Sequence, residues 1–302
     1  MSIRSTTAVL IAVCGLAAAA NAQVVDGTAE GLYGAPLAVQ NVQTQFGDAN
    51  IGQLGFANGS ELDAAYGFIS AGNLHLVLAG NLESNFNKIE IFFDSVAGGQ
   101  NQLRGDNPDV DFNGLNRMGN DGSGNGLRFD TGFEADRYLT ITNGDIGGGT
   151  YQMFANFAEV LSAGGGAGMF LGGASHTPAQ VIGPNGIIIS MNNSNVAGVD
   201  GGTGPASGLG VFTGVELVIP LSALGDPSGE IRISAFINGG GHDFLANQVL
   251  GGLGAGTGNL GEPRNVDFSA IAGDQFFTVI PAPGAVGLLG LAGLAAARRR
   301  RN

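Results

Sequence analysis

Short stretches of alternating or β-branched residues recur along the middle of this chain, and clusters of Gly, Asn, Asp and Pro separate them. Alternation puts successive side chains on opposite faces of a strand, and the separating residue types favour turns. The pattern predicts an all-β fold, a β-sandwich of the jelly-roll kind with long Gly/Asn-rich loops. The expected strands are 36–46, 62–70, 73–82, 88–94, 135–142, 150–157, 186–192, 211–219, 230–238 and 275–280.

Glycine content supports the same fold class. Because 55 of the 302 residues are glycine, which is costly inside helices, we expect little helix. A hydrophobic content of 44% suffices for a core, and residues 23–279 are expected to form a single domain. Two stretches, 97–131 and 161–184, are expected to be long loops. Loops of this length often carry function or bind an ion that orders them.

Two of the expected strands show which side they bury. In 88–94 three apolar residues share one face, opposite Lys88 and Glu90, which predicts a strand that is solvated on its Lys88 side. The stretch 230–238 repeats the alternation. The inward residues predicted for the two strands are Ile89, Ile91, Phe93, Ile231, Ile233, Ala235 and Ile237.

The first 22 residues are typical of a secretory signal peptide. Arg4 is their only charge, an apolar stretch follows, and small residues precede the expected cut between Ala22 and Gln23. A buried N-terminal helix is the alternative. Cys14, the only cysteine, lies in this segment, so cleavage leaves no thiol. Disulfides, cysteine-based zinc sites, iron–sulfur centres and thiol catalysis are thereby excluded.

The other end of the chain has a second targeting pattern. An uncharged run of 13 residues, Ala285 to Ala297, would form a transmembrane-like helix about 20 Å long, against about 30 Å of bilayer hydrocarbon. Four arginines follow it and are expected to stay on the cytoplasmic side. Pro281-Ala282-Pro283 precedes it.

Segment 280–302 resembles the PEP-CTERM sorting tail of exported bacterial proteins. The resemblance is carried by Pro281, Pro283, Arg298, Arg299, Arg300 and Arg301, in the order proline motif, apolar helix, arginine cluster; Ala282 replaces the usual glutamate. It implies an exosortase-like processing enzyme as partner. The protein would then reach the cell envelope, cell surface or extracellular matrix, anchored through its C-terminus. A simple tail anchor is the alternative.

Charge limits the partners. All 25 acidic residues lie between the two targeting segments, which hold five of the 12 basic ones, so the body carries 7 − 25 = −18. This argues against nucleic acid and anionic lipid, because binding either depends on basic side chains. Membrane contact is expected only through the C-terminal segment. Divalent cations and neutral sugars suit such a surface better.

A second resemblance lies in Val215 to Gly225. A strand ending in Ile-Pro-Leu, a helical turn capped by Ser222, a stop at Gly225 and a further strand resemble carbohydrate-binding modules of family 9 and the related DOMON domains. The resemblance implies a β-sandwich that, in some members, binds sugars or haem. Residues 111–118 and 241–248 are also similar to exported proteins of planctomycete-type bacteria.

A candidate metal site lies in the first long loop. Asp109, Asp111 and Asn113 alternate as oxygen donors, Gly114 permits a sharp turn, and the Leu115 carbonyl comes next, as in the first half of a calcium loop. The glutamate that closes such loops is absent. Calcium is the candidate cofactor of this loop, and the alternative, which the missing glutamate favours, is a loop whose Asp and Asn side chains satisfy its own backbone.

No catalytic set is visible, neither a G-x-S-x-G elbow nor a local Ser, His and Asp group. His242 follows three glycines, with Asp243 placed to orient its ring. Trp is absent, and Phe92 is the candidate for stacking on a sugar. We therefore predict a non-enzymatic, structural or binding role with extracellular polysaccharide as partner. The alternative is a secreted polysaccharide-active hydrolase, which would need a carboxylate pair in a cleft.

Overall fold

The computed structural model describes residues 23–47, 50, 56–202 and 204–281. The predicted signal peptide with Ala22, and the tail from residue 282 with Pro283 and Arg298 to Arg301, lie outside the described residues; Gln23 and Pro281 lie within them. In the part of the chain described, no helix has the length and apolar character needed to cross a membrane.

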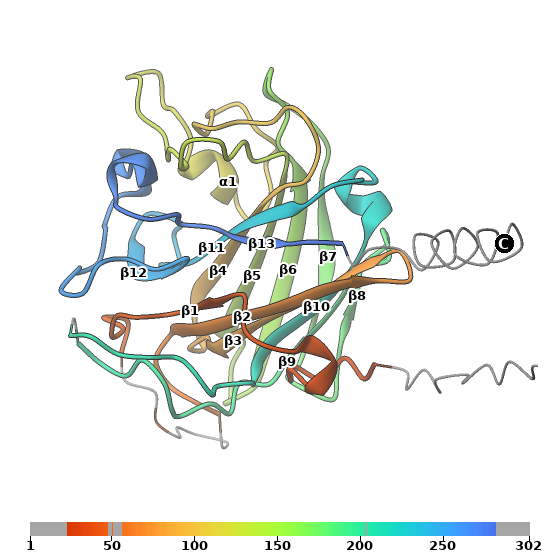
Figure 1. The fold of residues 1–302 in the computed structure, drawn as a ribbon, viewed down its shortest axis with the longest axis vertical. Coiled ribbons are helices and arrows are strands. Elements are labelled where there is room, and N and C mark those ends of the chain that lie inside the picture. The colour runs from red at the N-terminus through yellow and green to blue at the C-terminus, as the bar shows by residue number, and fades with distance from the viewer. Residues whose placement is uncertain (1–22, 48–49, 51–55, 203, 282–302) are drawn as a thin grey trace, which may run out of the picture.

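Two antiparallel sheets face each other (Figure 1). The first has six strands in the order β1-β2-β3-β10-β9-β8. Their bounds are β1 (Ala38–Val39), β2 (Glu61–Ser70), β3 (Asn73–Asn81), β10 (Gly214–Pro220), β9 (Ile188–Met191) and β8 (Val181–Ile182).

The second sheet has the order β12-β11-β4-β5-β6-β7, and β13 also pairs with β11. Its strands are β12 (Leu245–Leu250), β11 (Ile231–Asn238), β4 (Asn85–Asp94), β5 (Arg137–Asp145), β6 (Tyr151–Glu159), β7 (Gly168–Ala174) and β13 (Phe277–Val279). The short helices of the described residues are α1 (Gly114–Arg117), η1 (Gly31–Tyr33), η3 (Leu221–Leu224), η4 (Pro263–Asn265) and η5 (Phe268–Ala270). The predicted all-β fold of two packed sheets is confirmed.

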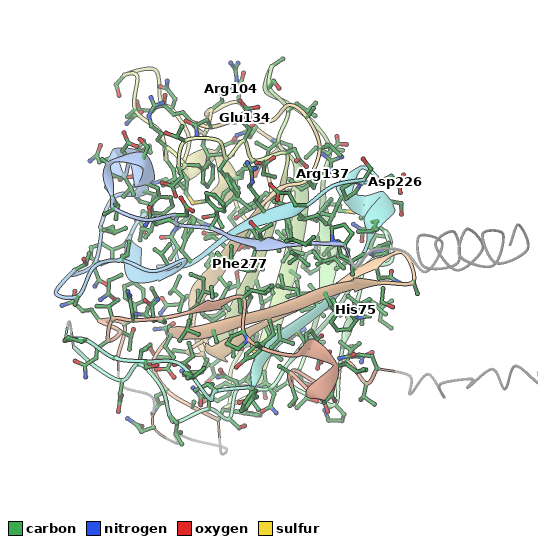
Figure 2. All side chains as sticks on the ribbon, in the orientation of Figure 1. His75, Arg104, Glu134, Arg137, Asp226 and Phe277 are labelled. Carbon is green, nitrogen blue, oxygen red and sulfur yellow. The ribbon has the colours of Figure 1, made fainter. Side chains whose placement is uncertain are left out.

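The main core fills the space between the sheets. It contains all seven residues predicted to point inward from 88–94 and 230–238, each at most 2% exposed. Leu74, Leu76 and Leu78 of β3 face them from the other sheet. Phe277 of β13, labelled in Figure 2, belongs to the same cluster.

The seven-stranded sheet is covered on its outer face as well. The loop after β4 folds back over this outer face. Arg104 and Glu134 mark this part of the molecule at the top of Figure 2. We call the cluster it forms the outer core: Phe92, Leu103, Val110, Leu115, Met118, Leu127, Phe129, Phe133, Ala135, Tyr138, Ala158, Val160, Phe236, Leu245, Val249, Leu253, Val266 and Phe268.

The outer core corrects two predictions. The Lys88 side of β4 is not solvated, because Lys88 is 4% exposed and Glu90 is fully buried. Phe92 is fully buried too, so it cannot stack on a ligand at the surface. A period of two identifies opposite faces of a strand, but it does not show whether water or a loop covers the second face.

Some elements also differ from expectation. The stretch 161–184 contains β7 and β8, and β12 was not predicted. Ser222 lies inside η3 and does not cap it, since Pro220 occupies the N-cap position. Gly225 does end this turn, with a left-handed φ of 84°.

Candidate ligand-binding site

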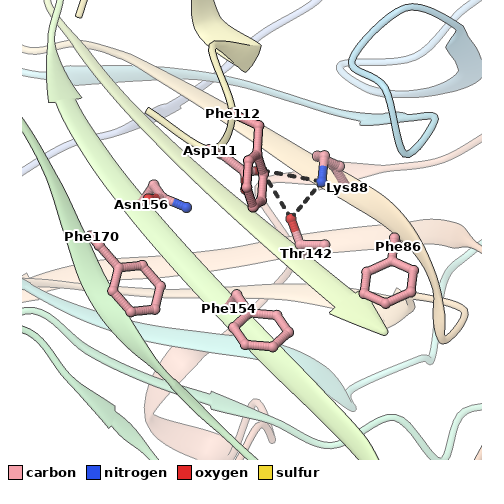
Figure 3. A pocket seen from close by; sticks show the side chains of 8 residues that line it. All are labelled: Phe86, Lys88, Asp111, Phe112, Thr142, Phe154, Asn156 and Phe170. Carbon is pink, nitrogen blue, oxygen red and sulfur yellow. Dashed lines mark hydrogen bonds and ion pairs between the residues drawn. The ribbon is translucent and has the colours of Figure 1, made fainter. Parts of the chain in front are cut away.

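A pocket of about 380 Å³ opens on the outer face of the seven-stranded sheet, beside the outer core. Strands β4 to β7 supply its floor and the tip of the loop after β4 overhangs it (Figure 3). We call it the ligand pocket; its lining residues are Phe86, Lys88, Asp111, Phe112, Thr142, Phe154, Asn156 and Phe170.

The alternation of side chains along a strand determines which floor residues point into the pocket. Along β6, Met153 and Ala155 belong to the main core, so the alternating Phe154 and Asn156 point to the outer face. Phe86 needs an additional feature, a glycine beneath its ring. A Cβ atom on Gly144 of β5 would lie 2.2 Å from the ring, so only glycine lets Phe86 lie against that strand.

The overhanging tip is strained and held at both ends. Val110 and Leu115 are buried in the outer core. Between them Asp111, Phe112 and Asn113 have φ values of 49°, 56° and 67°, in the left-handed region. Such conformations cost about 1–3 kcal/mol each and persist where the surroundings impose them. The result is that Phe112 projects from the tip with its side chain 100% exposed.

Strain gathers around this pocket. Among the described residues other than glycine, seven have positive φ, and five of them line the pocket, its rim or its supporting contacts. The five are Phe86, Asp111, Phe112, Asn113 and His242. A concentration of strained backbone at one place is typical of functional sites.

A buried charge network holds the tip down. Asp111 Oδ2 lies 3.2 Å from Lys88 Nζ and 3.0 Å from His242 Nε2, and it accepts a 3.1 Å hydrogen bond from the Thr142 hydroxyl. His242 Nδ1 lies 2.6 Å from Glu90 Oε1, and Tyr138 donates to the other oxygen of Glu90. We call these residues the Asp111 network. Its two carboxylates face two cationic side chains, so the charges balance.

The electrostatics agree with this pairing. Burial by itself would lower the pKa of His242, but the Glu90 charge and the hydrogen bond to Asp111 raise it to about 9. Burial would raise the pKa of Asp111, but the His242 hydrogen bond and the Lys88 charge lower it to about 2. His242 is therefore an imidazolium and Asp111 a carboxylate near neutral pH.

Gly114 makes room for this network. A Cβ atom at this first residue of α1 would lie 2.2 Å from His242 Nε2. Any larger residue would displace the imidazole from Asp111. The glycine predicted to permit a turn thus serves a second purpose, because it lets the ring reach the loop tip.

The predicted calcium ligands do not converge on one point. The Asp111 carboxylate contacts cationic side chains, Asn113 Oδ1 accepts from Asn116, Asp109 is exposed, and the Leu115 side chain is buried in the outer core. Within the described residues, no group of three or more His, Cys, Asp and Glu could hold a metal ion. Calcium binding by this loop stays a prediction, with no support from these contacts.

Phe112 also borders a second depression. It has about 380 Å³ and is lined by Phe112, Asn113, Asn116, Arg117, Asn120, Asp121, Arg264, Gly105 and Gly241. A third, of about 310 Å³, shares Gly105 and Asn120 with it and adds Arg104, Asp106 and Gly122. We call the second and third depressions the polar groove. The exposed Phe112 ring thus stands between an aromatic pocket and a groove lined by amides, guanidinium groups and carboxylates.

Sequence reasoning found part of this site. It singled out Asp111 and His242, but the ring of His242 is oriented by Glu90 and Asp111, and the exposed Asp243 does not take part. It missed the four phenylalanines of the pocket. Phe112 and Phe170 lay in the two expected loops, Phe154 in an expected strand whose faces were not assigned, and Phe86 just before the expected strand 88–94. Phe112 left one signal, a large apolar residue within a run of Asp, Asn and Gly.

Comparison with known proteins gives no match: no protein-family profile fits the chain, and no curated protein or solved structure is significantly similar to it. The likenesses to PEP-CTERM tails and to family 9 or DOMON sandwiches therefore stay predictions.

Proposed function

We propose that this protein is an exported surface protein that binds a polysaccharide chain along the ligand pocket and the polar groove. The observation that carries the proposal is the placement of Phe112, fully exposed and shared by both depressions. A single large exposed ring on a strained, anchored tip has no role in packing. It is well placed to contact a ligand that passes from one depression to the next.

The chemistry of the two depressions suits a chain of sugars. A pyranose ring has apolar C–H faces, which pack on aromatic rings, and hydroxyl groups at its edges, which need donors and acceptors. The ligand pocket supplies four phenyl rings and the polar groove supplies Asn, Asp and Arg side chains. Because the ligand pocket and the polar groove adjoin at Phe112, an extended ligand is favoured over one small molecule.

The acids of these depressions favour binding over hydrolysis. They are Asp106, Asp111 and Asp121, and each has a lowered pKa, owing to Arg104 for Asp106 and to Ser123 for Asp121. Burial opposes the lowering at Asp111, which His242 and Lys88 produce. A general acid for glycoside cleavage must stay protonated near neutral pH, which calls for a raised pKa. A hydrolase is therefore the weaker candidate.

Replacing the shared ring tests the proposal. Phe112→Ala is expected to weaken binding of a polysaccharide retained in a glycan-array screen about tenfold, because about 1–2 kcal/mol of ring contact is lost. Affinity electrophoresis or calorimetry measures the change. The thermal midpoint should not move, because the side chain has no protein contacts to lose.

Phe212→Ala is the matched control. Phe212 is another phenylalanine at the surface, half-exposed where Phe112 is fully exposed, and it packs near Tyr66 of the six-stranded sheet, away from the pocket. Binding by this variant should equal that of the unaltered protein. Equal losses in both variants, or none in Phe112→Ala, would show that the ligand does not use the tip.

Export belongs to the same proposal and rests on the two ends of the sequence. Deleting residues 284–302 is expected to shift the protein from the envelope fraction to the medium or the periplasm, because the apolar run and the arginines are removed. Immunoblots of fractionated cells measure the change. Replacing only Arg298 to Arg301 by glutamine separates the charge from the apolar run. Identical fractionation of full-length and shortened chains would refute a sorting role.

A further inference from the structure

We infer that the ligand pocket selects a sugar carrying an acetamido group, an inference that rests on the polysaccharide binding proposed above. Two polar groups at the pocket have hydrogen-bonding capacity that the described residues do not use, and four phenyl rings line the same pocket. The ligand must therefore offer a hydrogen-bonding group and an apolar group close together.

Asn156 is the first of the two polar groups. It is 6% exposed, its amide forms no hydrogen bond with any described residue, and Figure 3 shows that amide pointing into the pocket. Because the amide opens onto the pocket and is not used by the described residues, its donor and acceptor atoms are available for a ligand. Its neighbours on β6 and β7, Phe154 and Phe170, are apolar and cannot satisfy it.

Lys88 is the second group. Its ammonium carries three N–H bonds, and the recorded partners are Thr142 Oγ1 at 2.9 Å and Asp111 Oδ2 at 3.2 Å. One donor therefore remains at a residue that lines the pocket and is 4% exposed. Together Asn156 and Lys88 call for an acceptor oxygen on the ligand, and Asn156 can also accept from an N–H.

Charge decides which acceptor fits. Asp111 already neutralises Lys88, so the pocket offers no unbalanced positive charge to a carboxylate. An anionic sugar would instead approach Asp111, whose pKa is lowered and which stays ionised. A neutral carbonyl meets the same donors without that repulsion. An amide carbonyl is favoured over a uronic acid.

The phenyl rings of the pocket favour an apolar methyl next to the ligand's carbonyl. A methyl attached to the carbonyl would lie among Phe86, Phe154 and Phe170, which removes apolar surface from water. A hydroxyl at the same place would lose water and gain no partner from those rings. An acetamido substituent combines the carbonyl, the N–H and the methyl that the pocket requires.

Calorimetry with two tetrasaccharides tests the inference on the full chain. β-1,4-linked N-acetylglucosamine tetramer should bind at least tenfold more tightly than the glucose tetramer of the same linkage. Asn156→Leu keeps the volume of the side chain and removes both polar atoms. It should lower affinity for the acetylated tetramer about tenfold and leave affinity for the glucose tetramer unchanged.

The outcomes separate the two proposals. Equal affinity for both tetramers, or equal losses on Asn156→Leu, overturns acetamido selection, while a loss on Phe112→Ala keeps the polysaccharide proposal. Binding of neither tetramer also overturns acetamido selection, and the glycan-array result for Phe112→Ala then decides the wider function. Asn156→Ser is the second variant, in case Asn156→Leu does not fold. Its thermal midpoint should equal that of the unaltered protein.

Discussion

Replacing Asp111 by alanine is expected to lower the free energy of unfolding by about 3–5 kcal/mol. The substitution leaves the buried Lys88 and His242 facing Glu90 alone, so the network loses its charge balance. An uncompensated buried charge costs far more than the loss of an exposed ion pair. Urea denaturation followed by circular dichroism measures the difference. The variant should also lose ligand binding, because Asp111 fixes the tip that carries Phe112.

Asp109→Ala is the control, two residues away and exposed. It should change the free energy of unfolding by no more than about 0.5 kcal/mol, as is usual for surface substitutions. If the loop binds calcium, a different result is expected. Asp109→Ala would then lower the free energy of unfolding as much as Asp111→Ala, and a chelator would lower the thermal midpoint. A strongly destabilised Asp109→Ala would therefore favour a metal loop over the Asp111 network.

The second large effect is expected at a pair of buried carboxyl groups, Glu61 and Asp63 on β2. Both are at most 1% exposed, and Asn195 Nδ2 donates to each, at 2.6 and 2.9 Å. The backbone N–H of Val199 donates to Asp63. Within the described residues neither carboxyl group forms a salt bridge with a basic side chain. Two buried negative charges side by side are unfavourable, so the pair is expected to retain a proton.

Stability should therefore fall as pH rises. Burial, reinforced by the Asp63 charge, raises the pKa of Glu61 to about 9, and burial raises that of Asp63 to about 7. Both values exceed those of an unfolded chain, near 4, so the folded state binds more protons. The stabilisation is complete below about pH 4 and is lost as pH rises through about 7 and 9. The slope approaches about 1.4 kcal/mol per pH unit for each proton.

Glu61→Gln isolates this contribution, since glutamine keeps the shape and stays neutral. At pH 9 the variant should be more stable than the unaltered protein by about 3 kcal/mol, and near pH 5 the two should be similar. Denaturation at both pH values measures it. Glu134→Gln, at an exposed carboxylate, should leave the pH profile as it was. If stability depends on pH in Glu61→Gln as it does in the unaltered protein, ionisation of the Glu61–Asp63 pair does not lower the stability of the folded state.

The inward faces of the sandwich were predictable because they follow a period of two in β4 and β11. Three strands were not predicted, β7, β8 and β12, and for two of them the reason can be identified. In β7 three glycines among seven residues obscure the alternation. In β12 the buried Asn247 and Gln248 bond to backbone groups, so polar residues occupy positions where a pattern of hydrophobicity expects apolar ones. Local patterns do not show such partners.

The candidate site was less predictable than the fold. Lys88 and Glu90 come from β4, Asp111 from a loop and His242 from the turn after β11, up to 154 residues apart along the chain. Such a network depends on which segments meet across the sheet, and one sequence does not contain that information. A single lysine next to glutamate on one strand face was the available signal, and it was interpreted as a solvated face.

The outer core described above has a consequence for how this protein could change its specificity. The loop after β4 packs on its own apolar cluster, and the sheet separates that cluster from the interior. Insertions or substitutions at the tip can therefore be accommodated locally, without repacking the sandwich. Related chains with different loop tips are expected to bind different ligands while keeping the same two-sheet scaffold.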